Sequence, residues 1–261
     1  MKIISLNTCG GILRAPLMDF ILREVPSADA FCFQEMYQND VGIAEKEGTR
    51  MNLYGEIAAA LPDFFGTFEA AVEGKNFDIP IDKPVKCGLA IFTKKSHAAA
   101  FGSVFVAGSY NTLIPEGSHV NWPTMLQYAE VAGPSGTFVF AHIHGLPYPG
   151  NKLDTPDRLA QSDAIVRWVR SQKHPTVLSG DFNLLHGTQS IAKIEEIPMR
   201  NLIKEYGIKN TRPINHLLRY PEHSRQLFAD YAFVSPHIAV KKFSVPDIEI
   251  SDHLPLILEL A

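Results

Sequence analysis

The chain has 261 residues, of which 46% are hydrophobic and 20% are charged, and its formal net charge is -4. This composition excludes disordered and collagen-like proteins, and the chain is long enough to bury a sizeable core. Proteins that grip long duplex DNA non-specifically usually carry an excess of basic residues, because neutralising the phosphates supplies that affinity. The acidic balance argues against such a protein, although it allows a local basic patch.

The cysteines and the N-terminus bear on the compartment of the protein. Cys9, Cys32 and Cys87 are odd in number and lack a CxxC spacing, which argues against a disulfide framework and a zinc knuckle and predicts buried thiols. The first apolar run breaks at Asn7, too early for a signal peptide. No stretch approaches the ~20 apolar residues of a membrane span. We therefore expect a soluble, cytoplasmic protein.

The first third of the chain alternates buried strands with helices. The strands are expected to end at Asn7 and Glu35, and Gly10 provides a turn into the first helix. Glycine, proline and charged residues at 62–86 predict a long surface loop. The predicted strands are 2–7 and 28–34, and the predicted helices are 12–25 and 51–61.

The remainder is rich in β-branched and aromatic residues and predicts mostly strands. One amphipathic helix, 156–172, interrupts them, with Thr155 as its N-cap and Pro156 in its first turn. Because we find no repeat and no flexible linker, we expect a single domain, 1–261. Short strands with few βαβ units favour two packed sheets flanked by helices. The predicted strands are 88–93, 103–106, 124–131, 137–142, 176–179, 227–234, 239–245 and 254–260.

Polar residues gather where the predicted strands end, so we expect them to converge on one rim. Oxygen ligands suit magnesium or manganese rather than zinc. Such a metal polarises a phosphoryl oxygen, an aspartate orients the attacking water, and imidazolium and amide groups stabilise the developing charge. This set of side chains fits hydrolysis of a phosphate ester. The residues are Asn7, Glu35, His142, Asp181, Asn183, Asp252 and His253.

Several motifs follow the order and approximate spacing of a known family. They are the strand ending at Asn7, Phe33-Gln34-Glu35, Ala141-His142-Ile143, Ser179-Gly180-Asp181-Phe182-Asn183, Asp230-Tyr231-Ala232-Phe233 and Ser251-Asp252-His253. From residue 2 to residue 260 the chain resembles the endonuclease/exonuclease/phosphatase superfamily with the DNase I-like fold. The resemblance implies an α/β (α+β) fold, a four-layer sandwich of two packed mixed β-sheets flanked by helices.

The resemblance also implies a metal site. Glu35 would be the principal metal ligand. Asn7 and Asp252 would lie beside the metal through direct or water-mediated contacts. The metal would be Mg2+, replaceable by Mn2+.

Catalytic roles follow from the same resemblance. Asp181 would position or activate the nucleophilic water, and Asn183 would hold that water or a phosphate oxygen. His142 would contact the scissile phosphate. His253, oriented by Asp230, would do likewise or act in acid-base catalysis.

Each of these residues also has a simpler interpretation. Asn7 could cap the following helix, and Glu35 could be a solvated strand end. Asp181 could form an Asx turn with Asn183. Asp230 could pair with an arginine such as Arg225.

A zinc site is a second interpretation of one motif. His142 and His144 share a strand face, so they could form a zinc-type pair. Gly145 and Pro147 indicate instead that the strand ends near His142, and the sequence lacks further histidine motifs for a dinuclear site. We therefore expect His144 at the rim or in contact with substrate.

We predict a monomeric, magnesium-dependent phosphodiesterase that acts on nucleic acid or a nucleotide-like ester. Residues 148–152 and 62–86 are expected to shape its substrate groove. One alternative is a phosphomonoesterase that acts on a small phosphorylated metabolite or a phospholipid head group. Another is a non-catalytic binding protein of the same fold. The presence of Glu35, Asp181 and Asp252 argues against lost chemistry.

Overall fold

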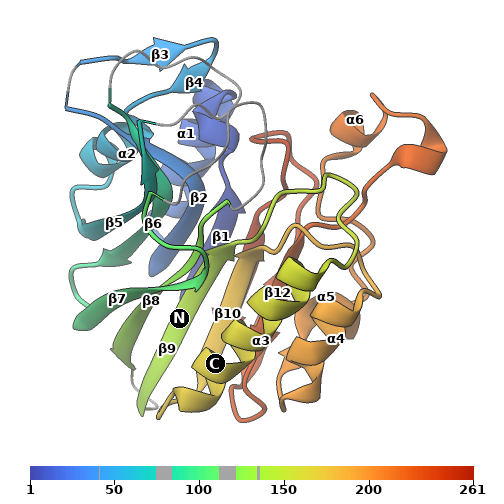
Figure 1. The fold of residues 1–261 in the computed structure, drawn as a ribbon. Helices are drawn as coiled ribbons and strands as arrows, with labels where there is room; N and C mark the ends of the chain where they lie inside the picture. Colours follow the sequence, from blue (N-terminus) through green and yellow to red (C-terminus); the bar gives the residue numbers. More distant parts are fainter. Residues whose placement is uncertain (41, 75–83, 112–121, 134–135) are drawn as a thin grey trace.

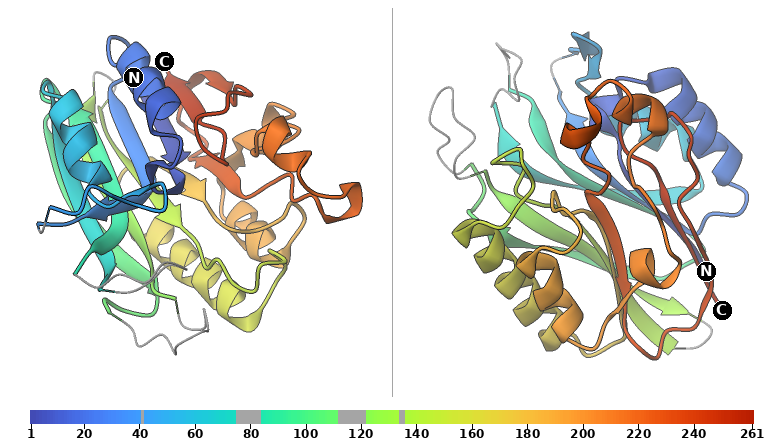
Figure 2. Two further views of the ribbon diagram at one scale, coloured as in Figure 1. Left: turned by 90° about the horizontal axis from the view of Figure 1, so that it is seen from above. Right: turned by 90° about the vertical axis from the view of Figure 1, so that its right-hand side faces the viewer.

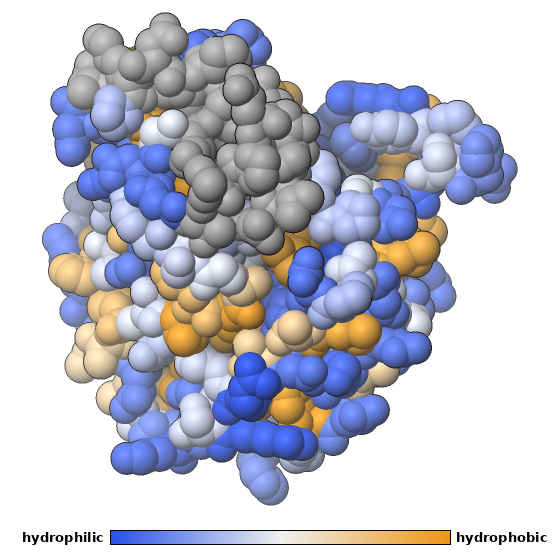
Figure 3. All heavy atoms as spheres, in the orientation of Figure 1, coloured by the Kyte–Doolittle hydropathy of each residue, from blue (hydrophilic) through white to orange (hydrophobic). Residues whose placement is uncertain are grey.

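The computed structural model describes residues 1–40, 42–74, 84–111, 122–133 and 136–261. Two six-stranded mixed sheets pack face to face, and helices cover their outer faces (Figures 1 and 2). The predicted four-layer α/β sandwich is therefore confirmed. The face seen in Figure 3 is mainly polar with scattered apolar residues, as is usual for a protein surface.

The first sheet holds the two N-terminal strands at its centre. In spatial order its strands are β13 (Val240–Ser244), β14 (Leu256–Leu260), β1 (Lys2–Asn7), β2 (Ala30–Gln38), β6 (Lys86–Lys94) and β5 (Phe64–Glu73). β1 and β2 are parallel, whereas the other neighbours are antiparallel. The helices α1 (Arg14–Glu24) and α2 (Leu53–Ala60) bury apolar side chains against the outer face of this sheet.

The second sheet has a similar plan. In spatial order its strands are β11 (Arg200–Asn201), β12 (Asp230–Val234), β10 (Thr176–Asp181), β9 (Gly136–His144), β8 (Thr124–Gly133) and β7 (Ala99–Ala107). β9 and β10 are parallel. The helices α3 (Pro156–Ser171) and α4 (Gln189–Glu196) lie side by side on its outer face.

Short elements complete the described chain. The helices α5 (Leu202–Glu205) and α6 (Ile214–Leu217), and a two-stranded sheet of β3 (Glu45–Lys46) and β4 (Thr49–Arg50), were not predicted. Two 3-10 turns cover Cys9–Gly11 and Glu222–Ser224. The segment around α6 projects from the body of the molecule (Figure 1).

Most predicted elements are present, and Thr155 caps α3 by accepting a hydrogen bond of 3.2 Å from the Arg158 backbone N–H. The loop predicted at 62–86 is wrong for residues 64–73, which form β5 and pair with β6. Its residues 75–83 lie outside the described part of the chain. Gly66 obscures the strand pattern because its missing side chain makes room for the Phe92 ring.

The burial of the cysteines and the character of the helices can be compared with the predictions. Cys32 and Cys87 are buried free thiols, as predicted, whereas Cys9 is only half-buried. Within the described ranges, no helix has both the length and the apolar character needed to cross a membrane.

Strand register brings the polar ends together. In the second sheet Asp181 lies opposite His144 on one side and opposite Asp230 on the other. β1 contacts β10 across the sandwich, so Asn7 at the end of β1 reaches the same edge. Both parallel pairs therefore end at one rim.

Candidate active site

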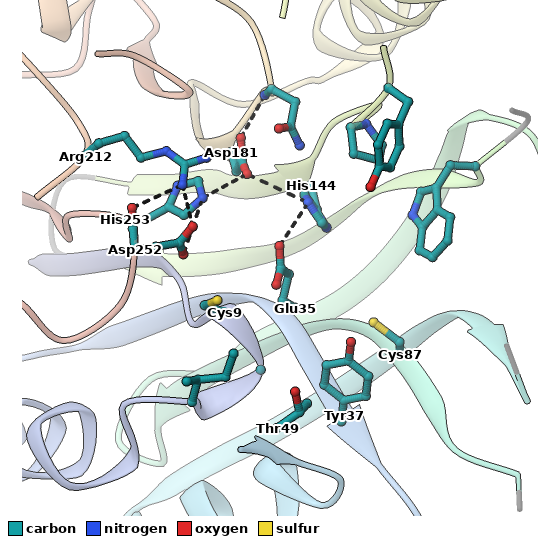
Figure 4. A pocket seen from close by; sticks show the side chains of 16 residues that line it. Cys9, Glu35, Tyr37, Thr49, Cys87, His144, Asp181, Arg212, Asp252 and His253 are labelled. Atoms are coloured by element: carbon teal, nitrogen blue, oxygen red, sulfur yellow. Dashed lines mark hydrogen bonds and ion pairs between the residues drawn. The ribbon is translucent and has the colours of Figure 1, made fainter. Parts of the chain in front are cut away.

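A pocket of about 360 Å³ opens at this rim. Figure 4 shows carboxylates, imidazoles and Arg212 gathered at one end and Tyr37 with Cys87 toward the other. The predicted site residues that line the pocket are Glu35, Asp181, Asn183, Asp252 and His253, and His144 joins them.

Asn7 joins two carboxylates beneath the pocket. Its Nδ2 donates to Glu35 Oε1 at 2.9 Å and to Asp181 Oδ2 at 3.0 Å. Its Oδ1 accepts a 2.9 Å hydrogen bond from the Cys9 backbone N–H. Asn7 thus orients both carboxylates, and its Oδ1 keeps a second lone pair, so its place beside the metal stays a prediction.

Glu35 reaches the pocket through a bulge. It lies within β2 rather than at the end of a strand, with φ at 54°. The pairing of β2 with β6 shifts between Phe33 and Met36. Such a bulge takes one side chain out of the regular alternation and re-aims it. The Glu35 side chain is consequently 31% exposed, facing His144 Nε2 at 3.6 Å.

Asp181 is the centre of the polar network. Its Oδ1 accepts a 2.8 Å hydrogen bond from the Asn183 backbone N–H, which is the local turn considered as the simpler interpretation. Burial raises the pKa of Asp181, but the positive charges of His253, Lys152 and His144 outweigh it and lower the pKa to about 2. The carboxylate is therefore ionised at neutral pH.

The amide of Asn183 is fully engaged. Its Nδ2 donates to the Gly145 carbonyl at 3.0 Å, and its Oδ1 accepts a hydrogen bond from Lys152 Nζ. Asn183 therefore lines the pocket with both amide ends already bonded.

His253 and Asp230 form the predicted pair. His253 Nδ1 lies 2.8 Å from Asp230 Oδ2, and its Nε2 lies 3.5 Å from Asp181 Oδ2. Burial and Arg212 oppose protonation of His253, but the surrounding carboxylates prevail and raise its pKa. Arg225, the alternative partner, instead donates to backbone carbonyls.

His142 does not reach the pocket, in contrast to its predicted contact with the phosphate. It is completely buried between the sheets, where its Nδ1 lies 2.7 Å from Gln34 Nε2 and its Nε2 lies 3.0 Å from Gln127 Oε1. Burial lowers its pKa to about 3. β9 continues to His144, two residues further along the same face, and His144 lines the pocket.

Asp252 is held by an arginine that the sequence did not indicate. Arg212 Nη1 lies 2.5 Å from Asp252 Oδ2 and 3.2 Å from the Asp252 carbonyl oxygen. Burial raises the pKa of Asp252, but His253 and Arg212 lower it well below its usual range. Asp252 and Glu35 both line the pocket, and their sharing of a metal ion stays a prediction.

Two buried cationic side chains at the site, Lys152 and Arg212, are not among the predicted site residues. Their exposed fractions are only 6% and 8%. Both lie in irregular segments, where periodicity gives no signal. Only the inclusion of Lys152 in the groove-forming segment 148–152 pointed to either of them.

Comparison with known proteins identifies the fold family. The family model described as the Endonuclease/Exonuclease/phosphatase family matches residues 4–253. The chain belongs to this family. Members of the family hydrolyse phosphate esters. No curated protein matches the chain.

Solved structures of the family superpose on the whole chain. A family protein from Leptotrichia buccalis has a TM-score of 0.74 at 16% identity, covering 100% of this chain and 99% of that one. A mannosyl-6-phosphatase from Bacteroides thetaiotaomicron has a TM-score of 0.70 at 18% identity, with 100% and 99% covered. The human Nocturnin catalytic domain has a TM-score of 0.67 at 16% identity, with 100% and 93% covered. Identities this low show a common fold alone.

Enzymes of the family commonly depend on a divalent metal ion, and the residues of this pocket fit one. Glu35 and Asp181 both accept hydrogen bonds from Asn7 Nδ2, so two carboxylates converge. Such oxygen donors suit a hard cation. Asp181, Asp230 and His253 also hold ligand atoms within 4.8 Å of one another. A cation there would compete with the hydrogen bond between Asp230 and His253.

Proposed function

We propose that the protein is a magnesium-dependent hydrolase that cleaves a phosphodiester by water attack on phosphorus, with manganese as a substitute. The observation that carries this proposal is the ionised Asp181, which faces His253 on one side and shares Asn7 with Glu35 on the other. A carboxylate acceptor beside an imidazole donor is the arrangement needed to orient water against a phosphoryl group.

The side chains divide the work as follows. Asp181 accepts a hydrogen bond from the attacking water and directs its lone pair at phosphorus. His253 keeps Nδ1 on Asp230, so Nε2 is the nitrogen that donates to a phosphoryl oxygen or protonates the leaving oxygen. His144, at the Glu35 side of the pocket, is the second imidazole available to the phosphate.

Glu35 and Asp181 are the residues that would hold the metal ion. When bound, the ion would polarise a phosphoryl oxygen and neutralise charge on the phosphate. Asn7 keeps the two carboxylates close together against their mutual repulsion. Asn7 therefore acts as a positioning residue.

Room on both sides of the phosphate favours a diester. The pocket extends from Arg212 and Asp252 to Tyr37 and Cys87, with His144 between these ends in the lining. A second pocket of about 300 Å³ adjoins it at Arg212 and Asp252. A diester carries a substituent on each side of phosphorus, and this shape accepts both.

The test compares bis(p-nitrophenyl) phosphate with p-nitrophenyl phosphate in the presence of magnesium, manganese or EDTA. We expect diester hydrolysis that requires the metal and falls by at least about 10³ in Asp181→Asn protein. The matched control is Asp163→Asn, which removes the same charge from a surface ion pair with Lys193, and it should retain activity within about twofold.

Each outcome has a distinct meaning. Turnover of the monoester alone would replace the diester proposal with a phosphomonoesterase. Equal rates for wild type and Asp181→Asn protein would disprove the role of Asp181. If properly folded protein hydrolyses neither ester with either metal, the alternative of a non-catalytic binding protein of this fold is favoured.

A further inference from the structure

Two buried arginines near the pocket use their side chains differently. Arg158 is completely buried, and all three of its guanidinium nitrogens donate to backbone carbonyls. These carbonyls belong to Leu146, Pro147, Pro149 and Leu153, so Arg158 fixes the loop after β9. An arginine whose whole fork is satisfied within the protein has a structural role.

Arg212 is nearly as deeply buried, with 8% of its surface exposed, but only its Nη1 donates within the described chain. Both bonds go to Asp252. Nε and Nη2 have no partner among the described residues. Neither nitrogen is among the fully buried atoms that lack a partner, and Arg212 lines the pocket, so both donors are open to a ligand that enters it.

The backbone around Arg212 is firmly held. The Thr211 N–H donates to the Leu227 carbonyl, and its carbonyl accepts from the Leu254 N–H at 2.9 Å. Its Oγ1 accepts from the backbone N–H groups of Ala229 and Asp230 at 3.0 and 3.2 Å. Thr211 thereby ties this segment to the start of β12 and to the loop that carries His253.

Arg212 faces the reacting centre. It lines both the main pocket and the adjoining one. Figure 4 shows its guanidinium group directed toward His253 and Asp181. Its positive charge stabilises the ionised forms of Asp181 and Asp252. A phosphoryl group beside Asp181 and His253 would meet the unused donors.

We propose that Arg212 is a catalytic residue that binds a non-bridging oxygen of the scissile phosphoryl group through its unused guanidinium donors. This inference rests on the proposed phosphoesterase function. In the reaction the bond from water oxygen to phosphorus forms as the water gives a proton to Asp181. The bond to the leaving oxygen breaks as that oxygen takes the electron pair and a proton from His253. Arg212 keeps its protons and stabilises the charge on the equatorial oxygens. Arginine suits this task because its planar fork matches phosphate oxygens.

The experiment measures kcat and KM for bis(p-nitrophenyl) phosphate with magnesium. Arg212→Met should lower kcat/KM by about 10²–10³, the usual cost of one oxyanion donor. Arg212→Lys, which keeps the charge and loses the fork, should lower it by about tenfold. The matched control is Arg219→Met, from an exposed ion pair with Glu249, and it should stay within about twofold of wild type.

A double-mutant comparison separates phosphate binding from support of Asp252. If Arg212 contacts phosphate, the Arg212→Met loss persists in an Asp252→Asn background. If Arg212 only positions Asp252, the loss disappears in that background, and the inference is overturned. Activity of Arg212→Met protein equal to that of Arg219→Met protein would also overturn it. Should Arg212→Met fail to fold, Arg212→Lys decides, because a wild-type rate at unchanged Tm contradicts the proposal.

Binding of inorganic phosphate, measured by calorimetry in EDTA, provides a readout that needs no turnover. The Kd should rise by about tenfold or more in Arg212→Met protein relative to wild type and Arg219→Met protein. An unchanged Kd would overturn the inference. Phosphate binding that depends on Arg212 in a protein without esterase activity would support Arg212 as an anion site and reject the proposed function alone.

Discussion

Two polar clusters lie close together between the sheets, and they serve different ends. The sealed cluster consists of Gln34, Gln127 and His142, and the open cluster consists of Asn7, Glu35, His144, Asp181, Asp230 and His253. β2 contributes adjacent residues to both, and β9 contributes residues two apart. Position along a strand, rather than residue type, therefore decides which cluster a side chain joins.

The clusters differ in charge as well as in exposure. In the sealed cluster His142 accepts from one amide and donates to the other, so the imidazole is neutral and its pKa is low. In the open cluster carboxylates surround His253 and raise its pKa. A neutral, hydrogen-bonded network suits a core, even though Gln34 Oε1 has no partner in it, whereas opposed charges beside a pocket suit catalysis.

The largest effect is expected from the open cluster. His253→Gln retains a group that can donate to Asp230 but removes the imidazolium, so kcat/KM should fall by about 10³. Steady-state kinetics on bis(p-nitrophenyl) phosphate would measure this. His237→Gln, on the exposed surface, is the control and should match wild type. A loss no greater than that of the control would mean that His253 is not part of the chemistry.

The sealed cluster should respond in stability instead. His142→Ala leaves Gln127 Oε1 without its donor, removes one of the acceptors of Gln34 Nε2 and opens a cavity. We therefore expect a loss of about 3 kcal/mol in the free energy of unfolding. Urea denaturation would measure it. The kcat of the folded variant should remain within about threefold of wild type, since the site lies further along the strand. A severe loss of kcat with an unchanged free energy of unfolding would mean that the sealed cluster acts in catalysis rather than in stability.

A smaller effect on activity is expected at the other pocket histidine. His144→Gln keeps a polar group near Glu35 but cannot supply an imidazolium to the phosphate, so kcat/KM should fall by about 30-fold. Unfolding in urea should change by less than about 1 kcal/mol, because the His144 side chain is part-exposed, at 19%. Wild-type kinetics in this variant would remove His144 from the proposed site.

The sequence predicts most strands of the sandwich and the helices α1, α2 and α3 from their periodicity, and a side-chain cap supports α3. It does not predict α4. The sequence also predicts that Asp181, Asp230 and His253 lie together. Each belongs to a motif near the end or the start of a strand, and the motifs occur in the order of the family. The sequence predicts His142 as the site histidine of β9, whereas the histidine that lines the pocket is His144, two residues later. Gly145 predicts the end of the strand, yet a Cβ there would lie 2.4 Å from the Phe182 carbonyl oxygen. Gly145 is needed for close packing.

The remaining site residues depend on tertiary contacts. Glu35 reaches the pocket because of a bulge in β2, and a bulge leaves no periodic signal. Arg212 and Lys152 come from irregular segments. Thr211 fixes the first by accepting hydrogen bonds from the backbone, and Arg158 fixes the second by donating to backbone carbonyls. Such distant bonds are not encoded in local pattern, so neither cation could be predicted.

The smallest expected effect is the pH dependence that His142 gives to the free energy of unfolding. The pKa of His142 is lowered by burial from 6.5 to about 3, so the folded protein does not bind this proton where the unfolded chain does. The stabilising difference is complete above pH 6.5 and is lost as pH falls from 6.5 toward 3. At pH 5.5 the loss should be about 1 kcal/mol relative to pH 8. His142→Gln protein lacks this group, so the stability difference between wild type and variant should shrink by that amount. Parallel stability curves for the two proteins would show that folding does not lower the pKa of His142, and the contrast between the two clusters would then fail.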